Sequence, residues 1–178
     1  RNVVGVGELG GSLNVSADGD NLILSSWFDA DVRIWDPATQ TRLRHIPNLA
    51  GPASAVRYQG DLAIAEHLKG AVTLFGEDET TVLANDLAAP TALVVDGEDL
   101  YVSDRSAGQI LKIASAGDAL ETPEVVVSDL ANPEGFLVTD DGFVIVEAEA
   151  SRILHVNGEG ERREIASTCR IREASPFT

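Results

Sequence analysis

Acidic residues recur at one place in a repeated pattern of this 178-residue chain. Glu66, Asp104 and Glu147 each end a short run rich in apolar residues, and the three runs read LAIAE, LYVSD and FVIVE. A fourth acid, Glu134, follows a proline in the segment Pro133-Glu134-Gly135. Gathered carboxylates serve as metal ligands or as general acids and bases, so these four residues are the first candidates for chemistry.

Glu134 and Glu147 are expected to face each other across a hairpin. If the turn is centred on residues 140–141, the two glutamates lie opposite, and facing Cβ atoms in such a pair are about 4.5–5.5 Å apart. Two facing carboxylates repel, so the pair needs a shared proton, a cation or an arginine partner. The alternatives are therefore a functional acidic pair, a pair in which one side chain turns outward, or a site that Arg105 or Arg152 neutralises.

The functional alternative assigns a role to each acid. We expect Glu134 to be a metal ligand, and Glu147 and Asp104 to be catalytic carboxylates. Asp104 occupies the position in the third repeat that Glu147 occupies in the fourth. The two carboxylates are therefore expected at the same level along the channel. Oxygen ligands favour calcium or magnesium over zinc, which prefers nitrogen and sulfur.

Residues at or after the ends of the equivalent runs, which include LILSS in the first unit, have side chains suited to ligand recognition. The ligand-binding candidates are Trp27, Asp29, Glu66, His67, Arg105 and Glu149. Loop tips are also polar and varied simply because nothing packs there. His67 beside Glu66 has the chemistry of a general base with an orienting carboxylate, but neighbouring strand residues point to opposite faces, which favours an incidental neighbour.

The elements that position these residues are four copies of one antiparallel unit. Equivalent strands begin at Leu22, Leu62, Leu100 and Phe143, at intervals of 40, 38 and 43 residues. Each strand follows an Asp/Gly-rich turn, a third strand carries apolar residues at two-residue spacing, and no helical period occurs. The period and the four strands per unit predict an all-β fold, a β-propeller of four-stranded antiparallel blades.

The repeat boundaries place the blades along one domain, residues 1–178. The four full blades are expected at approximately 12–51, 52–89, 90–132 and 133–171. Residues 2–7 read as the outer strand of a preceding blade, because residues 8–12 repeat the linker sequence pattern that separates the units. We therefore expect four full blades plus one leading strand, as part of a larger ring.

The residues of the third and fourth units carry a family resemblance. LYVSDRSAGQILKI (Leu100 to Ile113), preceded by NDLAAPTALVVDGED, resembles repeats of the NHL type and of the six-bladed senescence-marker-protein/gluconolactonase superfamily. DLANPEGFLVTDDGFVIVEAEASRILHV (Asp129 to Val156) is similar too. The pair Trp35-Asp36 also looks like part of a WD repeat, but only one of the four units shows it.

The resemblance implies a six-bladed ring with a divalent cation, commonly calcium, in the central channel. Its ligands in that family are acidic or amide side chains, several of them directly after the residue that opens an inner strand. The corresponding residues here are Leu13, Ala53, Thr91 and Glu134, and of these only Glu134 matches. Under the resemblance, further ligands come from blades outside this chain or from Asp104 or Glu147, and the alternative is that there is no metal.

Composition excludes several classes of function. Thirteen Lys and Arg against 29 Asp and Glu give a net charge of -16, which repels the phosphate backbone of nucleic acids. We expect no nucleic acid partner, and no membrane partner, because no apolar run is long enough to span a bilayer. The segment has no signal-peptide pattern and reads as an acidic soluble protein, and its localisation stays open.

These observations support three hypotheses of function. The leading one is a propeller scaffold that binds a small-molecule or peptide ligand at one mouth of the channel. The alternatives are a metal-dependent hydrolase of the lactonase type, and an NHL-like module that binds a protein partner without a metal. Whether the chain is an enzyme stays open.

Overall fold

The computed structural model describes residues 12–167, which form four antiparallel sheets of four strands each. Blade 1 holds β1 (Ser12–Asp18), β2 (Asn21–Ser26), β3 (Asp31–Asp36) and β4 (Thr41–Ile46). Blade 2 holds β5 (Pro52–Tyr58), β6 (Asp61–Glu66), β7 (Ala71–Phe75) and β8 (Thr80–Ala84). Blade 3 holds β9 (Pro90–Asp96), β10 (Asp99–Asp104), β11 (Gln109–Ser115) and β12 (Asp118–Val127). Blade 4 holds β13 (Pro133–Thr139), β14 (Gly142–Glu147), β15 (Arg152–Asn157) and β16 (Arg162–Ser167).

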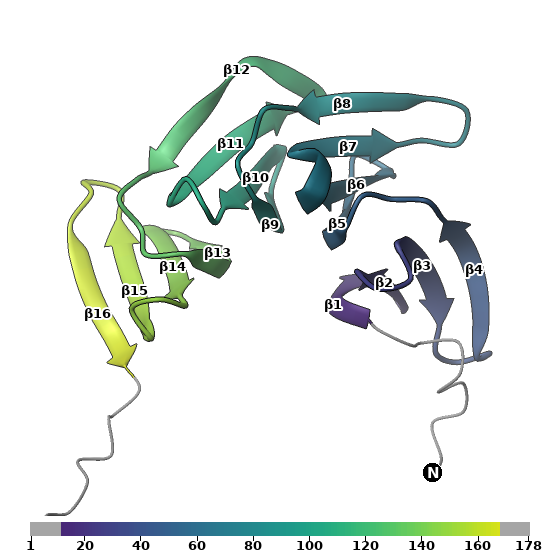
Figure 1. Ribbon diagram of the computed structural model, residues 1–178, viewed down its shortest axis with the longest axis horizontal. Helices are drawn as coiled ribbons and strands as arrows, with labels where there is room; N and C mark the ends of the chain where they lie inside the picture. Colours follow the sequence, from purple (N-terminus) through teal and green to yellow (C-terminus); the bar gives the residue numbers. More distant parts are fainter. Residues whose placement is uncertain (1–11, 168–178) are drawn as a thin grey trace, which may run out of the picture.

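The sheets are arranged as the blades of a propeller, which confirms the predicted fold class. They follow one another along an arc, with β1, β5, β9 and β13 innermost and β4, β8, β12 and β16 outermost (Figure 1). Residues 12–167 leave the arc open between blade 4 and blade 1, and the total of six blades stays a prediction. The predicted leading strand, residues 2–7, lies outside the described residues, as does the end of the predicted fourth blade, residues 168–171.

Helix is almost absent from residues 12–167. One 3-10 helix, η1 (His67–Lys69), follows β6 within the described part of the chain. Among residues 12–167, no helix has the length and apolar character that crossing a membrane requires.

The core consists of apolar layers between neighbouring blades. Alternate residues of one strand serve two layers: Leu100 and Val102 of β10 pack toward blade 2, whereas Tyr101 packs toward blade 4. Each blade therefore buries one face against each neighbour, and the two-residue period of the sequence is the cause.

The residues at which the equivalent strands were predicted to begin are buried to different degrees. Leu62 and Leu100 are 0% exposed, whereas Leu22 and Phe143 are only partly buried. Leu22 lies in blade 1, which has no described blade before it. Phe143 packs edge-on against Tyr101, with ring centroids 5.8 Å apart, and its ring remains partly accessible.

The linkers between blades begin with a residue in the left-handed region. Asn48, Asp86 and Asp129 have φ values of 62°, 57° and 53°. Asparagine and aspartate tolerate this conformation better than most other residues do, which explains why each linker opens with one of them. The chain thereby turns from the outermost strand of one blade back to the channel.

Replacing Leu100 with alanine tests the interior layers. The substitution removes a fully buried side chain between blades 2 and 3 and is expected to lower the free energy of unfolding by about 2–5 kcal/mol. Urea titration followed by fluorescence measures the change. The matched control is Leu43→Ala on β4, because Leu43 is 56% exposed and its loss is expected to cost about 0.5 kcal/mol or less. Equal losses for the two variants would contradict the layered core.

Candidate functional site

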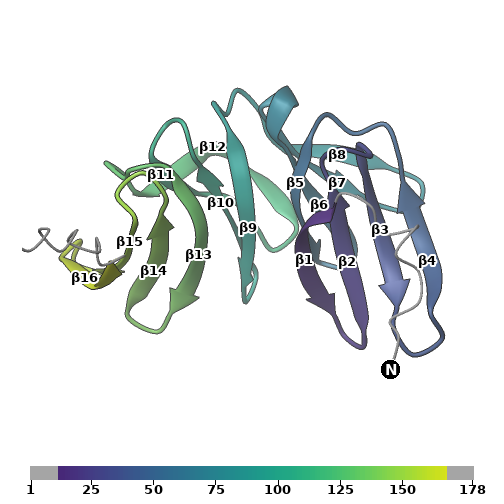
Figure 2. The same ribbon diagram turned by 60° about the horizontal axis from the view of Figure 1, so that its bottom comes forward.

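One mouth of the channel around which the blades are arranged, uppermost in Figure 2, gathers most of the candidate residues. The inner strands begin at this end, and the second strands of the blades finish there. The loops that follow β2, β6, β10 and β14 therefore surround the same channel mouth. The linkers between blades enter the inner strands at this mouth as well.

Buried carboxylates at the ends of the second strands accept hydrogen bonds from the linkers. Ala50 N–H donates to Glu66 Oε1 at 3.2 Å, and Ala131 N–H donates to Glu147 Oε1 at 2.7 Å. The two Asp104 oxygens accept from the N–H groups of Ala88 and Ala89 at 2.7 and 2.9 Å. We call Glu66, Asp104 and Glu147 the carboxylate clamp, since each holds the linker that leads into its own blade.

A second set of donors completes each clamp. Glu66 Oε2 accepts from Lys69 Nζ at 3.0 Å and from Thr73 Oγ1 at 3.1 Å. Asp104 Oδ1 also accepts from Ala107 N–H at 3.2 Å, within its own loop. The three carboxyl side chains are buried, with residue exposures of 4%, 2% and 0%. Buried carboxylates require such donors, so these contacts account for the acids structurally.

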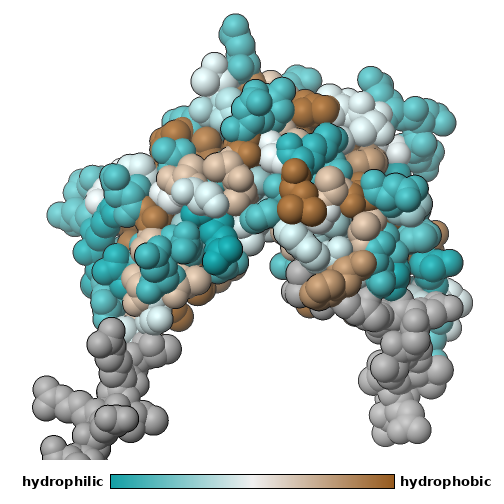
Figure 3. Space-filling model, in the orientation of Figure 1, coloured by the Kyte–Doolittle hydropathy of each residue, from teal (hydrophilic) through white to brown (hydrophobic). Residues whose placement is uncertain are grey.

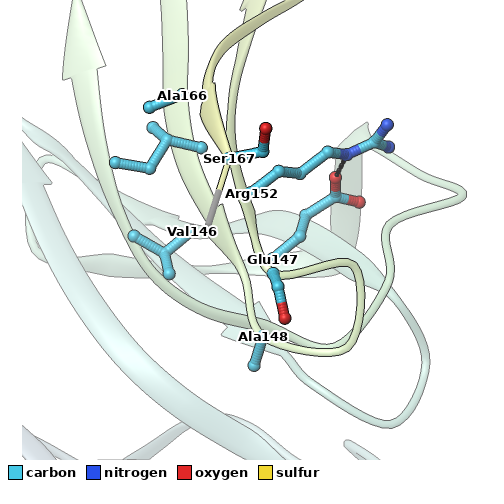
Figure 4. A pocket seen from close by; sticks show the side chains of 8 residues that line it. Val146, Glu147, Ala148, Arg152, Ala166 and Ser167 are labelled. Atoms are coloured by element: carbon cyan, nitrogen blue, oxygen red, sulfur yellow. Dashed lines mark hydrogen bonds and ion pairs between the residues drawn. The ribbon is translucent and has the colours of Figure 1, made fainter. Parts of the chain in front are cut away.

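The clamp of blade 4 adds an arginine. Figure 4 shows Glu147 and Arg152 pointing toward one another, and Arg152 Nε donates to Glu147 Oε2. They border a hollow of about 330 Å³ that Val146, Ile153 and Ala166 also line. The corresponding residues of blade 3, Ser103, Ile110 and Val127, are buried. This hollow therefore lies on a face of blade 4 against which no described blade packs, and it shares no lining residue with the hollow at the channel mouth.

The expected pairing of Glu134 with Glu147 is wrong. The predicted register holds from the hairpin turn as far as Phe136, which lies opposite Ile145. Beyond that pair, Pro133 and not Glu134 lies opposite Glu147. The strand pair has an irregularity between Pro133 and Phe136, so Glu134 has no facing partner on β14. The same shift occurs in blades 2 and 3, where Pro52 faces Glu66 and Pro90 faces Asp104.

Glu134 forms an ion pair with an arginine of the neighbouring blade. Arg105 Nε lies 2.7 Å from Glu134 Oε1, and the two side chains are 43% and 39% exposed. The two glutamates expected to share a cation thus have separate arginine partners, Arg105 and Arg152. This is the neutralised alternative that the sequence left open.

The described residues do not fit the calcium or magnesium site that the family resemblance implies. Within residues 12–167, no three His, Cys, Asp or Glu side chains are grouped so as to hold a metal ion. Glu134 is engaged with Arg105, and the oxygens of Asp104 and Glu147 accept hydrogen bonds from the protein itself. A hard cation needs several free oxygen ligands, which these residues do not supply.

A hollow of about 640 Å³ lies at the channel mouth. Trp27, His67 and Arg105 line it from the loops of three different blades, together with Glu134. The starts of the inner strands supply the remaining lining residues: Asn14, Ala53, Thr91, Ala92 and Gly135. Volumes of this order are typical of pockets for small organic molecules.

An aromatic pair forms one wall of this mouth hollow. The Trp27 and His67 rings meet edge to face, with centroids 5.1 Å apart. His67 Nδ1 lies 3.3 Å from the Pro90 carbonyl oxygen, which connects the ring to the inner strand of blade 3. The structure thus brings together Trp27, His67 and Arg105 of the predicted ligand-binding residues, and Glu134 of the predicted metal site.

The other predicted residues lie apart from the mouth hollow's lining. Asp29 forms an ion pair with Arg33 at 2.9 Å. Glu149 is exposed and accepts from Asn132 Nδ2 at 3.1 Å. Sequence reasoning missed Asn14 as a lining residue, because its exposure to the channel depends on the shifted register at the start of β1.

Comparisons with known proteins identify the architecture. No family model matches the chain, and no curated protein matches its sequence. Among solved structures, a streptogramin B lyase is similar with a TM-score of 0.68 and 15% identity, covering 88% of this chain and 54% of its own. An auxiliary nutrient binding protein from Bacteroides ovatus has a TM-score of 0.69 and 14% identity, with coverages of 88% and 47%. Hydrazine synthase of Kuenenia stuttgartiensis has a TM-score of 0.67 and 16% identity, with coverages of 89% and 50%.

These likenesses show the propeller fold alone, because the identities are low. The chain spans about half the length of the structures that it matches. The resemblance to NHL repeats and gluconolactonases remains a prediction.

The clamp predicts that Asp104→Ala destabilises the protein. The substitution leaves the Ala88 and Ala89 N–H groups without their acceptor and is expected to lower the free energy of unfolding by about 2–4 kcal/mol. Asp96→Ala is the control, since Asp96 is an exposed aspartate of the same blade. Chemical denaturation compares the two variants, and a loss no greater than that of the control would rule the clamp out.

The clamp of blade 4 also predicts a pH dependence. Burial raises the pKa of Glu147, but hydrogen bonds from Arg152 and the Ala131 N–H outweigh it, so the pKa lies below its ordinary value of 4.5. A depressed carboxyl pKa contributes stability above about pH 4.5, and this stability is lost as the pH falls through the folded-state pKa. The stability difference between wild type and Glu147→Gln should therefore be largest near neutral pH and shrink below about pH 4.5. Urea midpoints measured from pH 7 to pH 3 would show this, and a constant difference would contradict it.

Proposed function

We propose that this chain is a propeller scaffold whose channel mouth binds a small organic molecule or a peptide. The observation that carries the proposal is the mouth hollow, where Trp27, His67 and Arg105 converge from three blades. Ligand sites combine apolar or aromatic walls with a few placed polar groups, and this hollow has both. The propeller itself supplies only the rigid frame.

The chemistry of the hollow is divided between two walls. Trp27 and His67 offer an aromatic surface on one side, while Arg105 and Glu134 offer donors and acceptors on the other. Ala53, Ala92 and Gly135 also line the hollow and leave space, since their side chains are small or absent. A flat group that stacks on the aromatic wall with a polar end at Arg105 suits this arrangement.

A metal-dependent lactonase finds less support in the same residues. Asp104 and Glu147 would have to leave the linker N–H groups, and Glu134 would have to leave Arg105. Breaking such contacts inside the protein leaves buried donors without acceptors, which is costly. Two of the similar structures are named a lyase and a nutrient binding protein, so the scaffold by itself is compatible with either kind of function.

Tryptophan fluorescence tests the proposal. Trp27 lines the hollow and Trp35 is buried, so a Trp35→Phe variant leaves Trp27 as the sole tryptophan. Compounds that change the Trp27 emission should also raise the melting temperature, because a ligand at a hundred times its Kd stabilises the folded state by about 2.7 kcal/mol.

Arg105→Ala and Trp27→Ala should each weaken the binding of such a compound about tenfold or more. Arg42→Ala on the exposed part of β4 is the control and should leave the affinity unchanged. If a diverse compound and peptide library gives no response that depends on both Trp27 and Arg105, the proposal is wrong.

A further inference from the structure

Large apolar side chains are exposed beside the mouth hollow. Phe28, in the loop after β2, is 78% exposed, and Leu68, in η1 after β6, is 69% exposed. Each follows a residue that lines the hollow, Trp27 in one loop and His67 in the other. Figure 3 shows strongly hydrophobic side chains at the surface in the region of η1. We call Trp27, Phe28, His67 and Leu68 the apolar ledge.

Contacts join Trp27, His67 and Leu68 of the ledge, and Phe28 directly follows Trp27 in the same loop. The Trp27 and His67 rings touch edge to face at 5.1 Å. A Cβ atom placed on Gly51 would lie 2.9 Å from Leu68 Cγ and 3.2 Å from Trp27 Cη2, so Leu68 and Trp27 both cover this glycine. Gly51 also has a φ of 64°, which a side chain would strain. The linker between blades 1 and 2 therefore carries the ledge directly above it.

The ledge is confined to two of the four blades. Phe28 and Leu68 occupy the second position after the strand end, where blade 3 has Ser106 and blade 4 has Glu149. The same loops of the same fold are thus apolar in one half of the mouth and polar in the other. Exposed apolar residues that cluster in this way mark interaction surfaces, whereas scattered ones need no explanation.

The opposite wall is polar without a net charge. Arg105 and Glu134 neutralise each other, and because both are more than a third exposed, their remaining N–H groups and carboxylate oxygen stay accessible. A peptide group offers one acceptor and one donor, which matches an arginine beside a carboxylate. A ligand that ends in a free charge would disrupt the pair instead.

The electrostatic field that the net negative charge produces around the mouth favours basic ligands. The chain has a net charge of -16, and this net charge outweighs the exposed cations of the mouth loops, Lys69 and Arg105. Long-range attraction raises the association rate of cationic partners and lowers that of anionic ones. An acidic ligand would meet long-range repulsion from the net charge of the chain.

We propose that the channel mouth binds an extended basic peptide that seats a large apolar side chain on the ledge and places a backbone amide at the Arg105–Glu134 pair. The inference rests on the proposed function, since it assigns a ligand class to the same hollow. A peptide rather than a small molecule is favoured because the ledge continues past the hollow, from Trp27 and His67 to Phe28 and Leu68.

A library of short capped peptides tests this ligand class. The central residues are randomised, and the flanks are fixed as lysine, serine or aspartate in three separate sets. Binding to the labelled full chain should select aromatic or aliphatic centres, with the lysine set strongest and the aspartate set weakest. Raising the salt from about 0.05 M to about 0.5 M should reduce the advantage of the lysine set, because it screens exposed charges.

Variants of the ledge supply the second measurement. Phe28→Ser and Leu68→Ser should each weaken the selected peptides about fivefold to tenfold and leave the melting temperature unchanged, because both side chains are exposed. Leu43→Ser is the matched control, since Leu43 is a comparably exposed leucine on the outer strand β4, and it should leave the affinity unchanged.

The outcomes separate this inference from the proposed function. If small molecules bind the hollow through Trp27 and Arg105 but the peptide sets show no apolar selection, the proposed function holds and the peptide class is wrong. Selection of the aspartate set, or binding that Phe28→Ser and Leu68→Ser leave intact, would also overturn the inference. Loss of both small-molecule and peptide binding would overturn the two together.

Discussion

A linker that enters the channel mouth presents backbone N–H groups where no strand can accept them, and a buried carboxylate meets this need in blades 2, 3 and 4. Glu66, Asp104 and Glu147 each reach back from the second strand of a blade to the linker that precedes it. The exchange is reciprocal, because the residue after each acid donates its own N–H to a linker carbonyl: His67 to Gly51, Arg105 to Ala89 and Ala148 to Asn132. A buried charge is tolerated here because several donors surround it, and the loop and the linker become one rigid unit.

This constraint separates the frame of the mouth from its chemistry. The acid of the clamp is constant in type, but the residue that follows it varies from His67 to Arg105 to Ala148. Since the backbone of that next residue is held by the linker, its side chain is presented at the same height in each blade. Different chemistry can therefore occupy equivalent places without altering the fold, and the apolar and polar halves of the mouth arise in this way.

The architecture was readable in the sequence because strands and blades leave periodic signals. Apolar alternation and the recurring turns placed the strands around Leu62 and Leu100 correctly, and each of the four units forms a four-stranded sheet. The roles of the acids were harder to read, because register was counted outward from the hairpin turn. An irregularity beyond the last apolar pair, Phe136 and Ile145, shifts Glu134 away from Glu147, and the alternation of apolar residues does not mark it. One signal was available: an alanine of the linker precedes each clamp acid by 16 residues, in Ala50 and Glu66 as in Ala131 and Glu147.

The same spacing bears on how such a chain acquires its structure. Sheet proteins fold slowly when their contacts join distant parts of the chain, because the entropy of closing long loops is lost before any contact forms. Each clamp instead closes a loop of only 16 residues, and that loop contains the first hairpin of the blade. A blade can therefore close on its own linker before its neighbours have formed. Folding can then begin at any interior blade and spread to the blades on both sides. At each stage, the apolar faces that lack a partner are those of the outermost folded blades.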